Sequence, residues 1–142
     1  MAYEQRRTVR FEEVDFAQLV YFPRLFGFCH QTFEDFFRDE VGVPYAVMLQ
    51  KRRVGYPTVH AEADFRAPLR FGDEVAVVMD TVKVGTRSIS SRYRLFLEPG
   101  RSLCATVQIV TVAMSMDTYR SVDLPTDVRA AFERHLATAE EL

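Results

Sequence analysis

The chain has 142 residues, with 18 basic and 20 acidic side chains, so its formal net charge is −2. This length is typical of one domain and is sufficient for a hydrophobic core without disulfide support. A hydrophobic content of 48% excludes a disordered chain, and the near-neutral charge argues against a nucleic-acid partner. We therefore expect a single globular domain over residues 1–142.

The cysteines and the N-terminus indicate the cellular compartment. Cys29 and Cys104 lie far apart in apolar segments, which predicts two free core thiols and neither a metal site nor a disulfide framework. The N-terminus opens with polar residues and has no apolar segment of a signal peptide. The apolar runs are shorter than the ~20 residues of a membrane span. We expect a cytoplasmic protein with no membrane partner.

The first half of the chain predicts one strand and one long apolar helix. Residues 8–12 alternate apolar and polar side chains, as a strand does. Over residues 22–37, apolar side chains recur at steps of three and four, the spacing of one helical face. Pro23 suits the first helical position, and Gly42 is expected to end the helix. A short second helix is expected at residues 45–50.

The second half predicts four strands and a closing helix from Pro125 toward His135. Because the turns between the strands are short, the strands must pair antiparallel. A sheet with one long helix buries only one of its faces well, so the polar opposite face suits a partner subunit. We predict an obligately oligomeric α+β fold. The expected strands are residues 58–65, 74–84, 89–97 and 103–114, and the polar face contains Ser90, Arg92, Thr106 and Gln108.

Several familiar catalytic motifs are absent from the sequence. No glycine cluster forms a phosphate loop or a dinucleotide fingerprint, and neither G-x-S-x-G nor H-E-x-x-H occurs. The three histidines, His30, His60 and His135, are too widely spaced to suggest a metal site. We therefore expect chemistry by carboxylates, backbone dipoles or isolated histidines, with no metal or cofactor.

Asp15 is the most informative carboxylate, because it lies in an apolar connector just before the long helix. Partial desolvation in such a connector is expected to leave the carboxylate poorly solvated and reactive. The unpaired N–H groups at the helix start offer a positive dipole end that can hold a developing oxyanion. The residues alone allow two interpretations: the carboxylate of an acyl-transfer hydrolase, or an Asp that only forms a turn or caps the helix.

The segment from Asp15 to Pro23, DFAQLVYFP, resembles the D-x-x-G-x-V-[YW]-[YF]-P motif of hot-dog-fold acyl-CoA thioesterases of the 4-hydroxybenzoyl-CoA thioesterase type. The resemblance covers about residues 5–120, and the order of the expected elements is that of the hot-dog fold. Residues 29–34 and 57–61 also resemble the branch that hydrolyses 1,4-dihydroxy-2-naphthoyl-CoA. Further similar segments are residues 42–44, 57–65 and 67–73.

This resemblance implies an antiparallel sheet wrapped around one central helix, in a homodimer or homotetramer. It implies hydrolysis of an acyl-CoA, in particular an aromatic one, to the free acid and CoA. Asp15 takes the role of nucleophile or general base, and the backbone N–H of Phe22 that of the oxyanion donor. One residue departs from the motif: Gln18 replaces the usual glycine, which puts the loop geometry in question because non-glycine residues rarely adopt positive φ.

The remaining site residues are also implied by the resemblance. Lys83 and Arg87 align near the basic contacts to the CoA phosphates, with a solvated hairpin as the alternative. His30 and Glu34 form either a contact to an acyl hydroxyl or a simple helix-face pair. The substrate-binding candidates are Gln18, Tyr21, His30, Tyr56, Thr58 and His60, of which Tyr56 and His60 are equally open to purely structural roles.

Two alternative functions remain open beside aromatic acyl-CoA hydrolysis. One keeps the chemistry and changes the substrate to a fatty acyl-CoA or an acyl chain on a carrier protein. The other is a hot-dog module that binds acyl groups without turnover. Retention of Asp15 favours an enzyme, while Gln18 keeps the binding module open.

Overall fold

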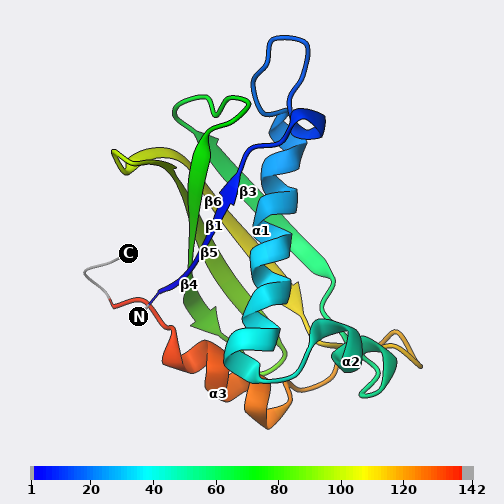
Figure 1. The fold of residues 1–142 in the computed structure, drawn as a ribbon. Coiled ribbons are helices and arrows are strands. Elements are labelled where there is room, and N and C mark those ends of the chain that lie inside the picture. Colours follow the sequence, from blue (N-terminus) through cyan, green and yellow to red (C-terminus); the bar gives the residue numbers. More distant parts are fainter. Residues whose placement is uncertain (1, 139–142) are drawn as a thin grey trace.

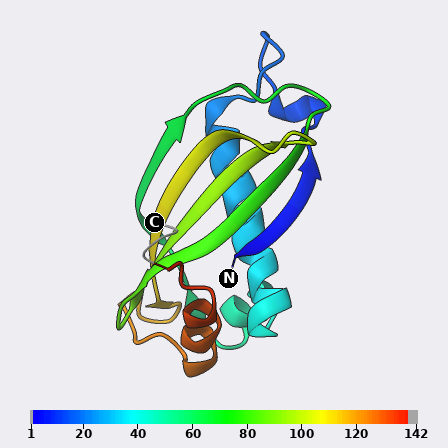
Figure 2. The ribbon, with the colours of Figure 1, turned by 90° about the vertical axis from the view of Figure 1, so that its left-hand side faces the viewer.

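A five-stranded antiparallel sheet curves around one long helix, α1 (Phe22–Phe36), in the computed structural model, which describes residues 2–138 (Figures 1 and 2). The strands follow the order β1-β4-β5-β6-β3. The expected architecture of one central helix and an antiparallel sheet is therefore confirmed. The strand bounds are β1 (Tyr3–Thr8), β3 (Thr58–Phe65), β4 (Glu74–Val84), β5 (Ser88–Glu98) and β6 (Ser102–Val112).

Short elements cover the two ends of α1. The 3-10 turn η1 (Phe11–Glu13) and the loop after it lie at the N-terminal end of α1, at the top of Figure 1. Helices α2 (Tyr45–Gln50) and α3 (Thr126–Arg134) lie at the opposite end. The other short elements are the π-helical turn η2 (Phe37–Val41) and the paired strands β2 (Val54–Gly55) and β7 (Met114–Ser115).

Helix α1 is held in place by its aromatic face. Phe28, Phe33 and Phe36 are each no more than 3% exposed and belong to the same core cluster as the inward residues of β4, β5 and β6. Burying one such side chain contributes about 1.5–3 kcal/mol, so this face dominates the packing of the helix. After η2 the chain turns at Gly42, whose φ is 83°, so the expected stop is confirmed.

Three details of the predicted elements are wrong. The first strand lies at Tyr3–Thr8 and not at residues 8–12. Residues 11–13 turn instead, because the Glu13 carboxylate accepts the Arg10 N–H at 2.8 Å. Pro23 is the second helical residue and not the first. The sequence does not predict strands β2 and β7, because two residues are too few to show the alternation of a strand.

The face of the sheet that points away from α1 contains a buried ion pair. Asp80 is 1% exposed, and its Oδ1 accepts Nε of Arg92 at 3.0 Å from the directly opposite position on β5. Arg94 adds a second cation, with its Nη2 3.6 Å from Asp80 Oδ2. The polar outer face expected from the sequence is therefore present. Within residues 2–138, no helix is long and apolar enough to span a membrane.

Both cysteines are free and buried, with Cys29 0% and Cys104 1% exposed. Burial also raises the pKa of the Cys29 thiol, and only the thiolate reacts with alkylating agents. We expect the native protein to resist iodoacetamide at mildly alkaline pH, and both cysteines to be alkylated after unfolding in urea. Mass spectrometry measures the extent, and rapid labelling of either thiol in the native protein would contradict this burial.

Candidate active site

Asp15 lies in a tight loop between η1 and α1. The Asp15 N–H donates to the Leu19 carbonyl at 2.9 Å, and the Gln18 N–H donates to the Asp15 carbonyl at 2.9 Å. Oδ1 of Asp15 accepts the Ala17 N–H at 2.9 Å. The loop backbone therefore orients the carboxylate through one oxygen, and the second oxygen has no hydrogen-bond partner among residues 2–138.

Gln18 adopts the backbone conformation that the motif glycine would adopt. Its φ is 65°, in the left-handed region that costs a non-glycine residue about 1–2 kcal/mol. Its carbonyl accepts the Phe71 N–H at 3.4 Å, which ties the loop to the segment before β4. Gln18 therefore adopts the positive φ that favours glycine, and strain is the consequence.

The predicted desolvation of Asp15 is wrong for a single chain. Asp15 and its neighbours Phe16 and Ala17 are all exposed, and Phe16 is fully so. The loop projects beyond the sheet, so nothing within the described chain shields the carboxylate (Figure 1). Any desolvation of this carboxylate must therefore come from bound substrate or from a second subunit.

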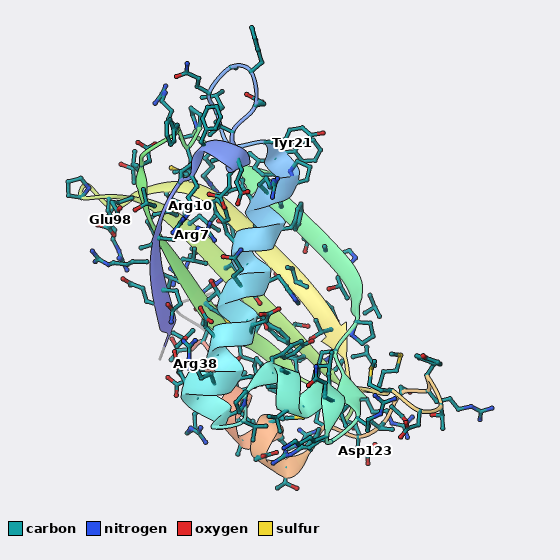
Figure 3. The ribbon with its side chains drawn as sticks, turned by 45° about the vertical axis from the view of Figure 1, so that its right-hand side comes forward. Arg7, Arg10, Tyr21, Arg38, Glu98 and Asp123 are labelled. Carbon is teal, nitrogen blue, oxygen red and sulfur yellow. The ribbon has the colours of Figure 1, made fainter. Side chains whose placement is uncertain are left out.

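The start of α1 offers one free backbone donor. The Tyr21 N–H donates to the Glu13 carbonyl at 3.0 Å, and the Arg24 N–H donates to the Tyr21 carbonyl at 2.8 Å. Pro23 has no N–H. No group within residues 2–138 accepts the N–H of Phe22, the first residue of the helix. Figure 3 shows Tyr21 at this end of α1, where it marks the helix start.

An apolar pocket of about 330 Å³, here called the helix-start pocket, opens beside this donor. Loop residues Leu19 and Val20 form part of its wall together with Phe22. Arg66 is the one charged residue that lines it, and its side chain makes no ion pair within the described chain. The sequence did not point to Arg66, because this residue falls between the two similar segments, residues 57–65 and 67–73.

A second pocket, the α1–β3 pocket, has a volume of about 430 Å³. It brings together two of the predicted substrate-binding residues, His30 on the helix and Thr58 on β3. His30 Nε2 lies 3.1 Å from Glu34 Oε1, so the helix-face pair is formed at the mouth of the pocket. The pocket is lined by Phe26, Gly27, His30, Phe33, Thr58, Ala61, Tyr93, Ile109 and Thr111.

Tyr56 and His60 do not join this pocket. Tyr56 is 5% exposed, and its ring centroid lies 5.1 Å from that of Phe37 in the core. Burial raises the pKa of its hydroxyl, as expected of a packed tyrosine. His60 is exposed and pairs with Val110, which puts its side chain on the sheet face away from α1.

Lys83 and Arg87 lie at the end of the molecule opposite to Asp15. Arg87 Nε is 3.0 Å from Asp123 Oδ1, and the adjacent turn carbonyls accept hydrogen bonds from Arg129 of α3. Figure 3 shows Asp123 near the α2 and α3 end, far from Tyr21. One chain therefore does not bring these two cations to its own Asp15.

The chemical groups at the start of α1 are thus a carboxylate, a backbone donor and an apolar pocket. Within residues 2–138 no three His, Cys, Asp or Glu side chains gather as ligands for a metal ion. The sequence profile of the thioesterase-like superfamily matches residues 9–132. The chain belongs to this superfamily.

Similar proteins agree with the resemblance and the hot-dog fold inferred from the sequence. A 1,4-dihydroxy-2-naphthoyl-CoA hydrolase from Picosynechococcus sp. is 31% identical over 129 residues, which cover 88% of each chain. A protein of the same name from Nostoc punctiforme is 28% identical over 87% of this chain and 76% of its own. The fold matches a 1,4-dihydroxy-2-naphthoyl-CoA thioesterase from Synechocystis with a TM-score of 0.85 at 23% identity, over 93% and 96% of the two chains.

The strain at Gln18 predicts a stabilising substitution. Gln18→Gly removes the left-handed penalty and should raise the free energy of unfolding by up to about 1 kcal/mol, measured by urea denaturation. Gln18→Ala keeps the strain without the amide and serves as the control. If Gln18→Gly is no more stable than Gln18→Ala, the left-handed conformation carries no penalty at this position. A difference in stability between Gln18→Ala and the wild type measures the contribution of the amide side chain.

Proposed function

We propose that this member of the thioesterase-like superfamily hydrolyses an aromatic acyl-CoA to the free acid and CoA, with no metal ion or cofactor. The observation that supports it most directly is that the start of α1 offers both an oriented carboxylate, that of Asp15, and a free backbone N–H, that of Phe22. The names of the curated relatives support an aromatic acyl group. The aromatic lining of the α1–β3 pocket also suits one.

In the proposed reaction the thioester carbonyl oxygen faces the Phe22 N–H. Asp15 either takes a proton from the attacking water or attacks the carbonyl carbon itself, forming an anhydride that water then cleaves. In both routes negative charge develops on the carbonyl oxygen, where the N–H and the helix dipole stabilise it. In the general-base route the C–S bond breaks when the resulting intermediate collapses, and the CoA thiolate takes up the proton held by Asp15. In the nucleophilic route the C–S bond breaks as the anhydride forms, and the thiolate takes up a proton from the water that later cleaves the anhydride.

The substrate-binding roles follow from position. We assign Gln18 and Tyr21, both exposed beside the helix start, to the thioester end of the substrate. We assign His30 and Thr58 to the acyl group, because both line the α1–β3 pocket. Tyr56 supports that pocket from the core, since its ring lies 6.3 Å from the Phe33 ring that lines it.

We further propose that the active site is completed in a homodimer or homotetramer. Strand β3 is an edge strand, and every residue in it except Ala63 is exposed, including the apolar Val59 at 60%. Proteins seldom leave such an edge unpaired. A second copy at β3 would shield Asp15, and Lys83 and Arg87 of another subunit would then hold the CoA phosphates.

A tetramer would also use the outer face of the sheet. Arg92 and Arg94 on β5 flank one side of β6, and Glu62 and Asp64 on β3 flank the other. Two such faces related by an axis along β6 place the cations of one copy opposite the carboxylates of the other.

The free buried thiols suit a reducing compartment, so we assign this assembly to the cytoplasm.

Asp15→Asn tests the catalytic proposal. The change keeps the volume of the side chain and removes its basicity, so kcat should fall by about 10²–10⁴-fold while binding of the CoA ester persists. Thiol release from aromatic acyl-CoA esters and a separate binding titration measure the two quantities. Glu12→Gln, which removes an exposed charge from the same region, is the matched control and should keep wild-type kcat.

Two results would contradict the proposal. If Asp15→Asn keeps kcat within threefold of the wild type, catalysis depends on another group. If the wild-type protein binds acyl-CoA esters but never releases thiol, the chain is an acyl-binding module. Faster thiol release from long-chain than from aromatic CoA esters would instead identify the substrate as a fatty acyl-CoA.

The assembly is tested by light scattering. At micromolar concentration we expect a mass at least twice the 16.4 kDa of one chain. Val59→Lys places a charge on the β3 edge and should yield monomers of low activity, whereas Tyr119→Lys, at a residue 72% exposed and outside β3, should change neither property. A fully active wild-type monomer would contradict the shared site.

A further inference from the structure

Gly27 lies in the middle of α1 without a structural reason within the chain. Glycine inside a helix lowers stability relative to alanine, because its backbone loses more freedom on folding. The residue is exposed, and its φ is not among the positive values found in the chain. A Cβ added at Gly27 would meet no atom within 4 Å, so no packing contact excludes alanine there.

Four other glycines do have such reasons. Gly42 and Gly72 adopt φ of 83° and 87°, which side chains rarely tolerate. An added Cβ at Gly55 would come within 2.7 Å of Met116 Sδ, and one at Gly85 within 2.6 Å of Ser88 Oγ. Gly27 is therefore the glycine whose destabilising effect on its helix is not explained by any contact within the described chain.

The free space beside Gly27 is the α1–β3 pocket. Gly27 lines it from the helix, and the small side chain of Ala61 lines it from β3. A methyl group at position 27 would take up open space beside the helix backbone that lines the pocket. Because the glycine has no side chain, the helix backbone forms this part of the wall.

The size and lining of the pocket indicate what the space accepts. A cavity of about 150 Å³ suffices for benzene. The α1–β3 pocket has about 430 Å³, which leaves room for a second fused ring. The rings of Phe26, Phe33 and Tyr93 line it, and aromatic groups stack favourably on such walls.

We propose that Gly27 is a specificity-determining residue, whose missing side chain admits the second ring of a bicyclic aromatic acyl group against α1. This inference rests on the proposed thioesterase function and goes further by assigning the width of the acyl group to one residue. One methyl group in an apolar pocket changes discrimination between substrates by about 10–200-fold.

The experiment compares 2-naphthoyl-CoA with benzoyl-CoA in Gly27→Ala and Gly27→Leu. We expect the ratio of kcat/KM for the two esters to fall at least about tenfold in Gly27→Ala and further in Gly27→Leu. Hydrolysis of benzoyl-CoA should stay within threefold of the wild type. Gly100→Ala, where an added Cβ has only an ordinary contact at 3.8 Å to Ser102 Oγ, is the matched control.

The melting temperature separates this role from a structural one. Gly27→Ala should raise Tm by roughly 2–4 °C, because alanine is the better helix former, while selectivity falls. A lower Tm with dissociation of the oligomer would make Gly27 a subunit contact and overturn the proposal. An unchanged ratio of kcat/KM in both variants would also overturn it.

Failure of the proposed function gives a different result. If the wild type hydrolyses neither ester, the thioesterase proposal fails. The role of Gly27 in the pocket is then tested by ligand binding alone. Calorimetry with the thioethers S-(2-naphthylmethyl)-CoA and S-benzyl-CoA then measures the ratio of their dissociation constants. A loss of naphthyl preference in Gly27→Ala supports the pocket role, and an unchanged preference excludes it.

Discussion

Burial of the aromatic face of α1 against the concave side of the sheet is the interaction on which the rest of the structure depends. Phe28 and Phe36 are both 1% exposed, and they share a core with Val77 and Tyr93 of the central strands. Because this contact fixes the helix along the sheet, it also fixes where the helix begins. The Phe22 N–H and the Asp15 loop therefore lie together at one end of the molecule, and α2 and α3 close the other (Figure 1).

The same arrangement leaves the candidate active site open in one chain. The Asp15 loop is exposed, and the edge strand β3, whose Phe65 ring lies 6.3 Å from the Phe22 ring at the helix start, offers unpaired backbone groups. A carboxylate in water is a weak base, and a sheet edge in water invites pairing. The proposed second copy would resolve both features at once. Catalysis and assembly are thus coupled in the proposed function, because the single chain supplies the groups but not their shielding.

Two positions in this structure retain residues that lower stability near the site. Gln18 holds a left-handed conformation at φ 65°, and Gly27 occupies a position inside the continuous helix α1 where alanine would fit. Strain and lost helix propensity of this kind occur where function needs a particular shape. The first keeps the loop of Asp15 in its turn, and the second leaves open space on the helix side of the α1–β3 pocket.

Local patterns in the sequence predict the elements with strong periodicity and the motif that contains Asp15. The long helix, its stop at Gly42 and the Asp15 segment depend on neighbours in the chain, so their patterns are visible without the fold. Which of the predicted site residues lie close together depends on the tertiary structure. Thr58 and His60, two apart on one strand, would share a face, but a bulge between them sends Thr58 into the pocket and His60 to the opposite face. The resemblance predicts Arg87 as a CoA contact, yet the path of β4 places it beside Asp123, at the far end from Asp15. A bulge and a strand direction are set by pairing between distant segments, which no local pattern in the sequence records.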